Sequence, residues 1–150
     1  LPISPRGQLI AGGTNRGWPV RGMKDNLLQR LDWTGRTPFE ILDIRAQSDG
    51  FIVRFTQPVD AALASLPQSY GLQTYTHIYQ QGYGSPEVDH TSPTVTKAEV
   101  APDGMSARLR VAGLVQGHVH DFHLPALRSR EGEPLLHDRA YYTLNEIPKP

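Results

Sequence analysis

The sequence predicts an all-β fold: a β-sandwich of about seven strands at 38–150, preceded by a strand-loop-strand arm at 1–37. Two observations predict this fold. Apolar and polar residues alternate in short runs, as in half-buried strands, and do not follow helical spacing. The 13 prolines and 14 glycines are spread along the chain, which is typical of many short strands joined by turns. With 150 residues, the chain is long enough to bury one core without covalent cross-links.

The arm differs in sequence pattern from the rest of the chain. Two short apolar runs, at 8–11 and 28–33, flank a glycine-rich loop at 12–19. An isolated hairpin is only marginally stable in water. We therefore expect the arm to pack on something else, either on the body of this chain or on a neighbour.

The body begins with a predicted hairpin. Its strands, at 38–46 and 51–56, are joined by a turn that contains Gly50. Asp60 follows a proline and is placed to cap a short helical turn at 61–64. The five further strands are expected at 70–77, 94–100, 107–111, 118–124 and 141–144, with a long polar loop at 80–93. Seven strands in about 100 residues fit an immunoglobulin-like or fibronectin-III-like sandwich.

Composition argues against several classes of function. The 15 basic and 15 acidic residues cancel, so the chain has no strong field to attract nucleic acid, and we expect no nucleic-acid partner. No window holds 18 consecutive apolar residues, so we expect no membrane insertion. The absence of cysteine excludes disulfides, thiolate nucleophiles and iron–sulfur ligation. The first residues lack the pattern of a signal peptide, so we expect the chain to begin inside a larger or processed protein.

No catalytic constellation stands out in the sequence. The serines lack a nucleophile-elbow motif, and the glycine-rich loop lacks the Gly-Lys-Ser/Thr ending of a phosphate-binding loop. We therefore assign no catalytic residue, and we expect that the chain is not an enzyme by itself.

A cluster of histidines at 118–123 suggests a metal site. Because side chains alternate along a strand, His118 and His120 share one face, whereas Asp121 and His123 share the other. At most two of these histidines can bind one metal. His120 also falls where immunoglobulin-like domains often carry the corner tyrosine. That position favours a structural histidine, with a metal site at His118 and His120 as the alternative.

Aromatic residues are the remaining candidates for contacts. Alternation places Tyr75 and Tyr79 on one face. Tyrosine and tryptophan rings stack on sugar rings, but they also seal contacts between domains. We favour a contact with a partner domain and keep a carbohydrate platform as the alternative. The candidate contact residues are Arg16, Trp18, Tyr75, Tyr79 and Tyr83.

Two sets of motifs carry a resemblance to known families. Phe-Thr-Gln-Pro-Val-Asp at 55–60 and Ser-Arg-Glu-Gly-Glu-Pro-Leu at 129–135 resemble segments of bacterial immunoglobulin-like domains. Gly-Gly-Thr-Asn-Arg-Gly-Trp at 12–18 and Tyr-Gly-Ser-Pro-Glu-Val-Asp at 83–89 resemble the C-terminal region of large secreted sorbosone or glucose dehydrogenase-like proteins. In those proteins the last β-propeller blade is followed by an immunoglobulin-like domain.

The resemblance implies a context for the chain. It implies a periplasmic or extracellular protein whose pyrroloquinoline quinone (PQQ) or haem cofactor is held elsewhere in the parent, with no cofactor in this fragment. The chain would be a non-catalytic accessory module that docks on a neighbouring propeller or cytochrome-type domain. A carbohydrate-binding module, which would attach to polysaccharide, and a histidine-based metal-binding domain are the alternatives.

Overall fold

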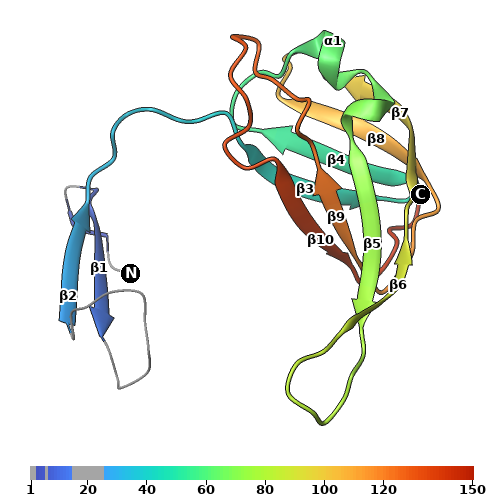
Figure 1. Cartoon of the computed structure of the whole chain (residues 1–150). Helices are drawn as coiled ribbons and strands as arrows, with labels where there is room; N and C mark the ends of the chain where they lie inside the picture. Colours follow the sequence, from blue (N-terminus) through green and yellow to red (C-terminus); the bar gives the residue numbers. More distant parts are fainter. Residues whose placement is uncertain (1–2, 6, 15–25) are drawn as a thin grey trace. The chain divides into compact units, whose positions relative to one another are not determined.

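The computed structural model describes residues 3–5, 7–14 and 26–150, and the chain divides into two compact units, Leu1–Arg36 and Thr37–Pro150. The first unit contains an antiparallel hairpin of β1 (Leu9–Thr14) and β2 (Asn26–Leu31), in which Leu9 lies opposite Leu31 (Figure 1). Both strands were predicted, with bounds shifted by one to three residues. The Gln8 side chain donates to the Asp32 carboxylate over 2.7 Å, which ties the ends of the hairpin together.

The second unit is a sandwich of two four-stranded antiparallel sheets. The strand orders are β10-β9-β5-β6 and β3-β4-β8-β7, and Figure 1 shows the second sheet behind the first. The strands are β3 (Ile41–Gln47), β4 (Gly50–Phe55), β5 (Gly71–His77), β6 (Glu87–Thr91), β7 (Thr94–Val100), β8 (Ser106–Ala112), β9 (His118–His123) and β10 (Arg139–Leu144). The predicted all-β sandwich is confirmed.

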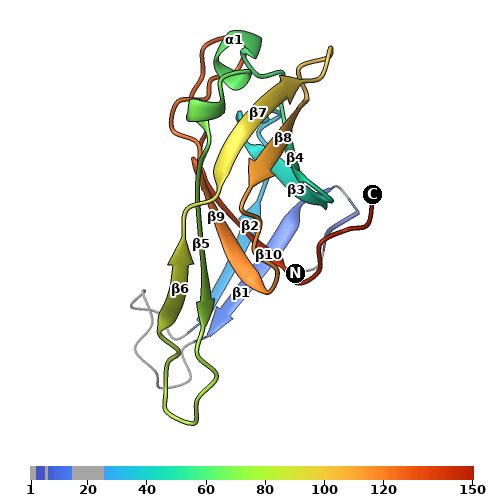
Figure 2. The ribbon, with the colours of Figure 1, turned by 90° about the vertical axis from the view of Figure 1, so that its right-hand side faces the viewer.

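The additional strand is β6, which lies inside the segment predicted to be a long loop. Its side chains are almost all exposed, so the sequence lacks the apolar alternation that marks a half-buried strand. Backbone pairing with β5 forms it. The chain then crosses from one sheet to the other at Ser92 and Pro93, and Figure 2 shows β6 leading into β7.

The core lies between the two sheets and is dominated by aromatic contacts. Phe51 of β4 is fully buried, and its ring lies 5.1 Å from the ring of Phe122 and 5.5 Å from that of Tyr142, measured between centroids. Both partners belong to the opposite sheet. Edge-on ring contacts of this kind add to the hydrophobic stabilisation from burial, so Phe51 links the two layers.

Two local features follow the sequence-based prediction. Asp60 caps α1 (Ala61–Ala64), because its carboxylate accepts from the Leu63 amide over 3.0 Å. Gly50 follows the turn between β3 and β4 with a φ of 157°, and a Cβ atom there would clash with the carbonyl oxygen of Leu109. Only glycine allows the central strand β8 to approach so closely.

The outer face of the sheet β3-β4-β8-β7 is charged. Arg54 pairs with Asp43 over 2.8 Å, and Lys97 pairs with Glu99 over 2.8 Å. Exposed ion pairs of this type add little stability, so this face is a solvated surface. In the part of the chain that the structure describes, no helix is long and apolar enough to cross a membrane.

Candidate functional site

The outer face of the other sheet, β10-β9-β5-β6, differs in character. Gln73 of β5 and Tyr141 of β10 both lie opposite Asp121 of the central strand β9. One step along the ladders, Gly71 and Arg139 lie opposite His123. Because alternate residues of a strand share a face, these six positions form one continuous patch on the outside of the sandwich.

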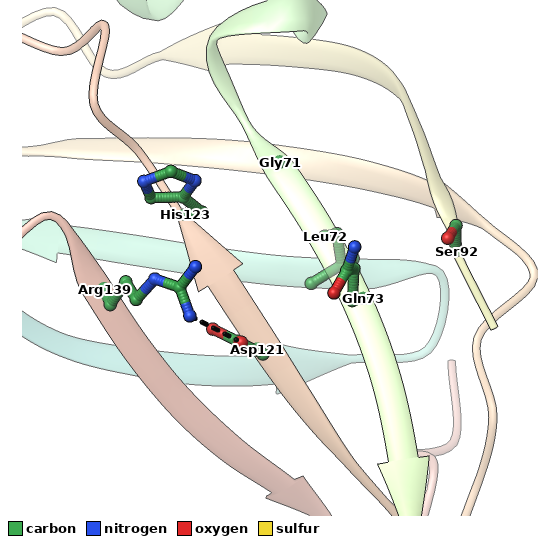
Figure 3. A pocket seen from close by; sticks show the side chains of 7 residues that line it. All are labelled: Gly71, Leu72, Gln73, Ser92, Asp121, His123 and Arg139. Carbon is green, nitrogen blue, oxygen red and sulfur yellow. Dashed lines mark hydrogen bonds and ion pairs between the residues drawn. The ribbon is translucent and has the colours of Figure 1, made fainter. Parts of the chain in front are cut away.

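A pocket of about 270 Å³ is hollowed into this patch. Figure 3 shows it from close by, with Asp121 between the side chains from β5 and β10. It is lined by Gly71, Leu72, Gln73, Ser92, Asp121, His123 and Arg139. Most of the lining side chains can donate or accept hydrogen bonds, so the pocket is suited to a polar ligand.

Asp121 is the most enclosed polar side chain that lines the pocket, with 14% of its side chain exposed. Its Oδ2 atom lies 3.4 Å from an Arg139 guanidinium nitrogen. Its Oδ1 atom is buried and finds no hydrogen-bond partner among the described residues. A buried acceptor without a partner costs free energy, so a rotation of the carboxylate that exposes this oxygen to a donor would be favoured.

Gly71 shapes the pocket by lacking a side chain. A Cβ atom there would lie 3.1 Å from the carbonyl oxygen of His123 on the neighbouring strand. Glycine inside a strand often marks a place where a backbone or a ligand comes close. Here the backbone of β9 comes close, and the same absence of a side chain leaves space above the strand.

Tyr75 continues the patch along β5. Its ring lies 5.4 Å from that of His77 and 5.7 Å from that of His90, measured between centroids. Burial raises the pKa of Tyr75, and the negative charges of Glu87 and Asp121 raise it further. The hydroxyl therefore stays protonated at physiological pH and is available as a hydrogen-bond donor.

The other two tyrosines lie in the tyrosine loop, defined as residues 78–86 between β5 and β6. The structure corrects the expectation that strand alternation carries on to Tyr79, because β5 ends at His77. At that point the His77 ring binds the carbonyl oxygen of Ser85 over 3.1 Å and turns the chain. Tyr79 and Tyr83 are both fully exposed. Figure 1 shows the loop extending beyond the end of the sandwich.

The remaining contact candidates, Arg16 and Trp18, lie outside the described residues. Their role as contact residues stays a prediction.

The clustered histidines lie on two different faces of β9, as strand geometry requires. His120 is fully buried, with its Nδ1 atom 3.3 Å from the carbonyl oxygen of His118. Burial lowers the pKa of His120. His118 is half-buried and its Nδ1 atom lies 3.3 Å from the Gln116 carbonyl oxygen, while His123 faces the opposite side. Within the described ranges, no group of three or more histidine, aspartate or glutamate side chains is placed to hold a metal ion.

Comparison with known proteins finds similar folds among solved structures. No family model and no curated protein matches the chain. A crystal structure of the N-terminal part of the bacterial S-layer protein SbsC matches with a TM-score of 0.56 and 22% identity, over 73% of this chain and 24% of that one. A longer crystal structure, of S-layer protein rSbsC, matches with a TM-score of 0.55 and 22% identity, over 73% and 14%. The structure of surface layer protein SbsC, domains 1-6, matches with a TM-score of 0.53 and 21% identity, over 71% and 14%.

These comparisons correct the family resemblance. The chain spans between 14 and 24% of the S-layer structures that it matches, and at this level of identity the likeness concerns the fold alone. The resemblance to sorbosone or glucose dehydrogenase-like, PQQ-type propeller proteins is wrong, because the three solved structures above, which share this fold, are of S-layer proteins. The segment at 83–89, which suggested it, forms the end of the tyrosine loop and the start of β6. The expectation that this chain binds no cofactor stays a prediction.

Proposed function

We propose that the chain is a non-catalytic accessory module of an exported, cell-surface protein, and that it docks on a partner protein domain through the tyrosine loop. The observation that carries the proposal is the complete exposure of two aromatic rings, those of Tyr79 and Tyr83, at the end of one loop. Tyrosine is enriched among the residues that dominate the binding energy of protein interfaces.

Two hydrogen bonds within the tyrosine loop restrain it. The Ile78 amide donates to the Pro86 carbonyl over 3.3 Å, which closes the base of the loop. The Gln80 side chain donates to the Gly84 carbonyl over 2.6 Å, which fixes the tip. Since these hydrogen bonds limit the shapes that the loop can take, docking requires less loss of conformational entropy than the ordering of a free segment would.

The cell-surface setting is supported by the fold. The three solved structures reported above are of S-layer, or surface layer, proteins. Folds host many functions, so the likeness supports a setting, and the docking role depends on the loop itself.

A retention experiment tests the proposal. The double variant Tyr79→Ser/Tyr83→Ser is produced in the native host, and the fraction that stays with the cell surface after washing is compared with that of the unaltered protein. We expect about tenfold weaker attachment, because each ring is placed as an interface anchor. The matched control is Leu136→Ser, which removes another exposed apolar side chain, 62% exposed, from a different loop.

The controls make the result decisive. Both variants should unfold at the same temperature as the unaltered protein, since the substituted side chains are exposed and are not part of the core. Equal retention of all three proteins would rule out docking through the tyrosine loop.

A further inference from the structure

The pocket around Asp121 is distinct from the tyrosine loop and has no part in the docking proposed above. Apart from Ser92, its lining residues lie on the strands β5, β9 and β10 of the sheet, so their side chains are held by backbone ladders. Sites built on strands hold their polar groups in place more accurately than sites built on loops.

The chemistry of the lining favours a ligand rich in hydroxyl groups. Asp121 accepts hydrogen bonds, Arg139 donates them, and Gln73 does both. A hydroxyl group also does both, so neighbouring hydroxyls can each find a partner in such a pocket. An anionic ligand would meet the charge of Asp121, and a metal ion would find too few ligands, because only Asp121 and His123 among the lining side chains are suitable.

The Oδ1 atom of Asp121 also favours a ligand rich in hydroxyl groups. The other oxygen of this carboxylate is paired with Arg139, whereas Oδ1 is buried and without a partner among the residues described. A rotation of the Asp121 carboxylate that exposes Oδ1 to the pocket would let a hydroxyl group there donate to it in a charge-assisted hydrogen bond, the stronger kind.

Aromatic rings stand beside the polar groups. Tyr141 lies opposite Asp121 on β10 and is 60% exposed. Tyr75 lies two residues beyond Gln73 on β5, opposite Val119. A pyranose ring has polar edges and apolar C–H faces, so it requires hydrogen-bonding groups and an aromatic surface together, as ligand sites generally combine apolar walls with a few placed polar groups.

We propose that this pocket binds one neutral hexopyranose unit of a saccharide. Asp121 accepts from one hydroxyl and Arg139 donates to its neighbour, Gln73 binds a hydroxyl at the opposite wall, and the ring of Tyr141 covers a C–H face. The volume of about 270 Å³ lies just below the range of about 300–1,000 Å³ found for drug-sized ligands, so the pocket holds a single sugar ring.

The test is a titration of the isotope-labelled chain followed by amide-resolved NMR. The probes are cellotetraose, maltotetraose, mannotetraose and N-acetylchitotetraose, each at concentrations up to about 10 mM, where sites with dissociation constants near 1 mM are largely filled. We expect at least one probe to bind with a dissociation constant of about 1 mM or lower. Its largest amide shifts should fall at Gly71, Gln73 and Asp121.

Variants separate the pocket from other causes. Asp121→Asn should weaken binding about tenfold or more, because a charge-assisted hydrogen bond is lost. The matched control is Asp43→Asn on the other sheet. Asp43 also pairs with an arginine and also has a buried Oδ1 atom without a partner in the described ranges, but it is not part of this pocket. That variant should bind like the unaltered chain.

The outcomes are distinguishable from those of the docking proposal. Tyr79→Ser/Tyr83→Ser should leave the titration unchanged if the pocket is the sugar site. The proposal is overturned if no probe shifts the pocket amides of the unaltered chain, or if binding follows the loop tyrosines and ignores Asp121.

Discussion

The ring of His120 packs at a tilt of 59° against the ring of Phe51 inside the sandwich, with 5.2 Å between the centroids. The contact joins the two sheets, because Phe51 belongs to β4 and His120 to β9. The Nε2 atom of His120 is buried and has no hydrogen-bond partner in the part of the chain that is described. A proton on that nitrogen would create a buried, unpaired charge, so the ring is neutral in the folded protein.

Protonation of His120 should therefore make stability depend on pH. Burial lowers the pKa of this ring in the folded state, whereas in the unfolded state it titrates near its ordinary value of about 6.5. Above that pH both states hold the neutral ring and the stability is full. As the pH falls below about 6.5, the unfolded chain binds a proton that the folded chain does not. The free energy of unfolding should decrease, by at most about 1.4 kcal/mol per pH unit, until the lowered pKa is reached.

Urea unfolding between about pH 7.5 and pH 5 measures this dependence. His120→Phe keeps an aromatic ring in the core and should remove most of the slope. His90→Gln changes an exposed histidine and should keep it. A His120→Phe variant with the slope of the unaltered protein would show that another group is responsible.

Loss of the α1 cap should have a moderate cost. The Asp60 carboxylate accepts from the Leu63 amide at the start of the helix, and removal of such a cap costs about 1 kcal/mol. Asp60→Ala should lower the free energy of unfolding in urea by this amount. Asp60→Asn keeps a capping oxygen and should stay close to the unaltered protein; an equal loss in both variants would contradict a capping role.

The close approach of β4 and β8 should make Gly50 irreplaceable. Gly50→Ala places a methyl group against the carbonyl oxygen of Leu109. We expect a loss of about 3 kcal/mol or more in the free energy of unfolding, measured by thermal and urea unfolding. Gly82→Ala is the control, since the nearest atom to its Cβ position would be a flexible side-chain nitrogen of Gln80, 3.7 Å away. Similar stability of the two variants would contradict the steric argument.

The hydroxyl group of Tyr70 should contribute to stability separately from its ring. It donates to the carbonyl oxygen of Ala64 over 2.7 Å within the core, and burial raises the pKa of Tyr70. Tyr70→Phe should cost about 1 kcal/mol in urea unfolding, the usual value of a buried hydrogen bond. Tyr83→Phe removes an exposed hydroxyl and should cost nothing measurable; a neutral Tyr70→Phe variant would show that water replaces the bond.

The sequence predicted the sandwich because its central strands alternate. Phe51 and Val53 share one face of their strand, and Leu109 and Val111 share a face of theirs, and all four are buried. The strand β6 was missed because it is held by backbone pairing and leaves both faces almost wholly exposed. Hydrophobic periodicity reports burial, so an exposed edge strand carries no such signal.

The pocket could be predicted only in part. Alternation placed Asp121 and His123 on the face away from the core, as the structure has them. Two residues that complete the pocket, Gln73 and Arg139, come from two other strands, β5 and β10. Their positions depend on the register of β5 and β10 against β9, which a single sequence does not specify outside the buried face. The signal that could have drawn attention is Gly71, a glycine at the start of a strand with buried residues.

The most direct test of the central claim, docking through the tyrosine loop, is site-specific photocrosslinking in the native host. A benzophenone amino acid replaces Tyr79 in one sample and Leu136 in another, and the cross-linked peptides are identified by mass spectrometry. We predict one dominant protein partner, cross-linked at Tyr79 and absent at Leu136. Cross-links at Tyr79 that reach only saccharide, or that are no more frequent than at Leu136, would contradict the account.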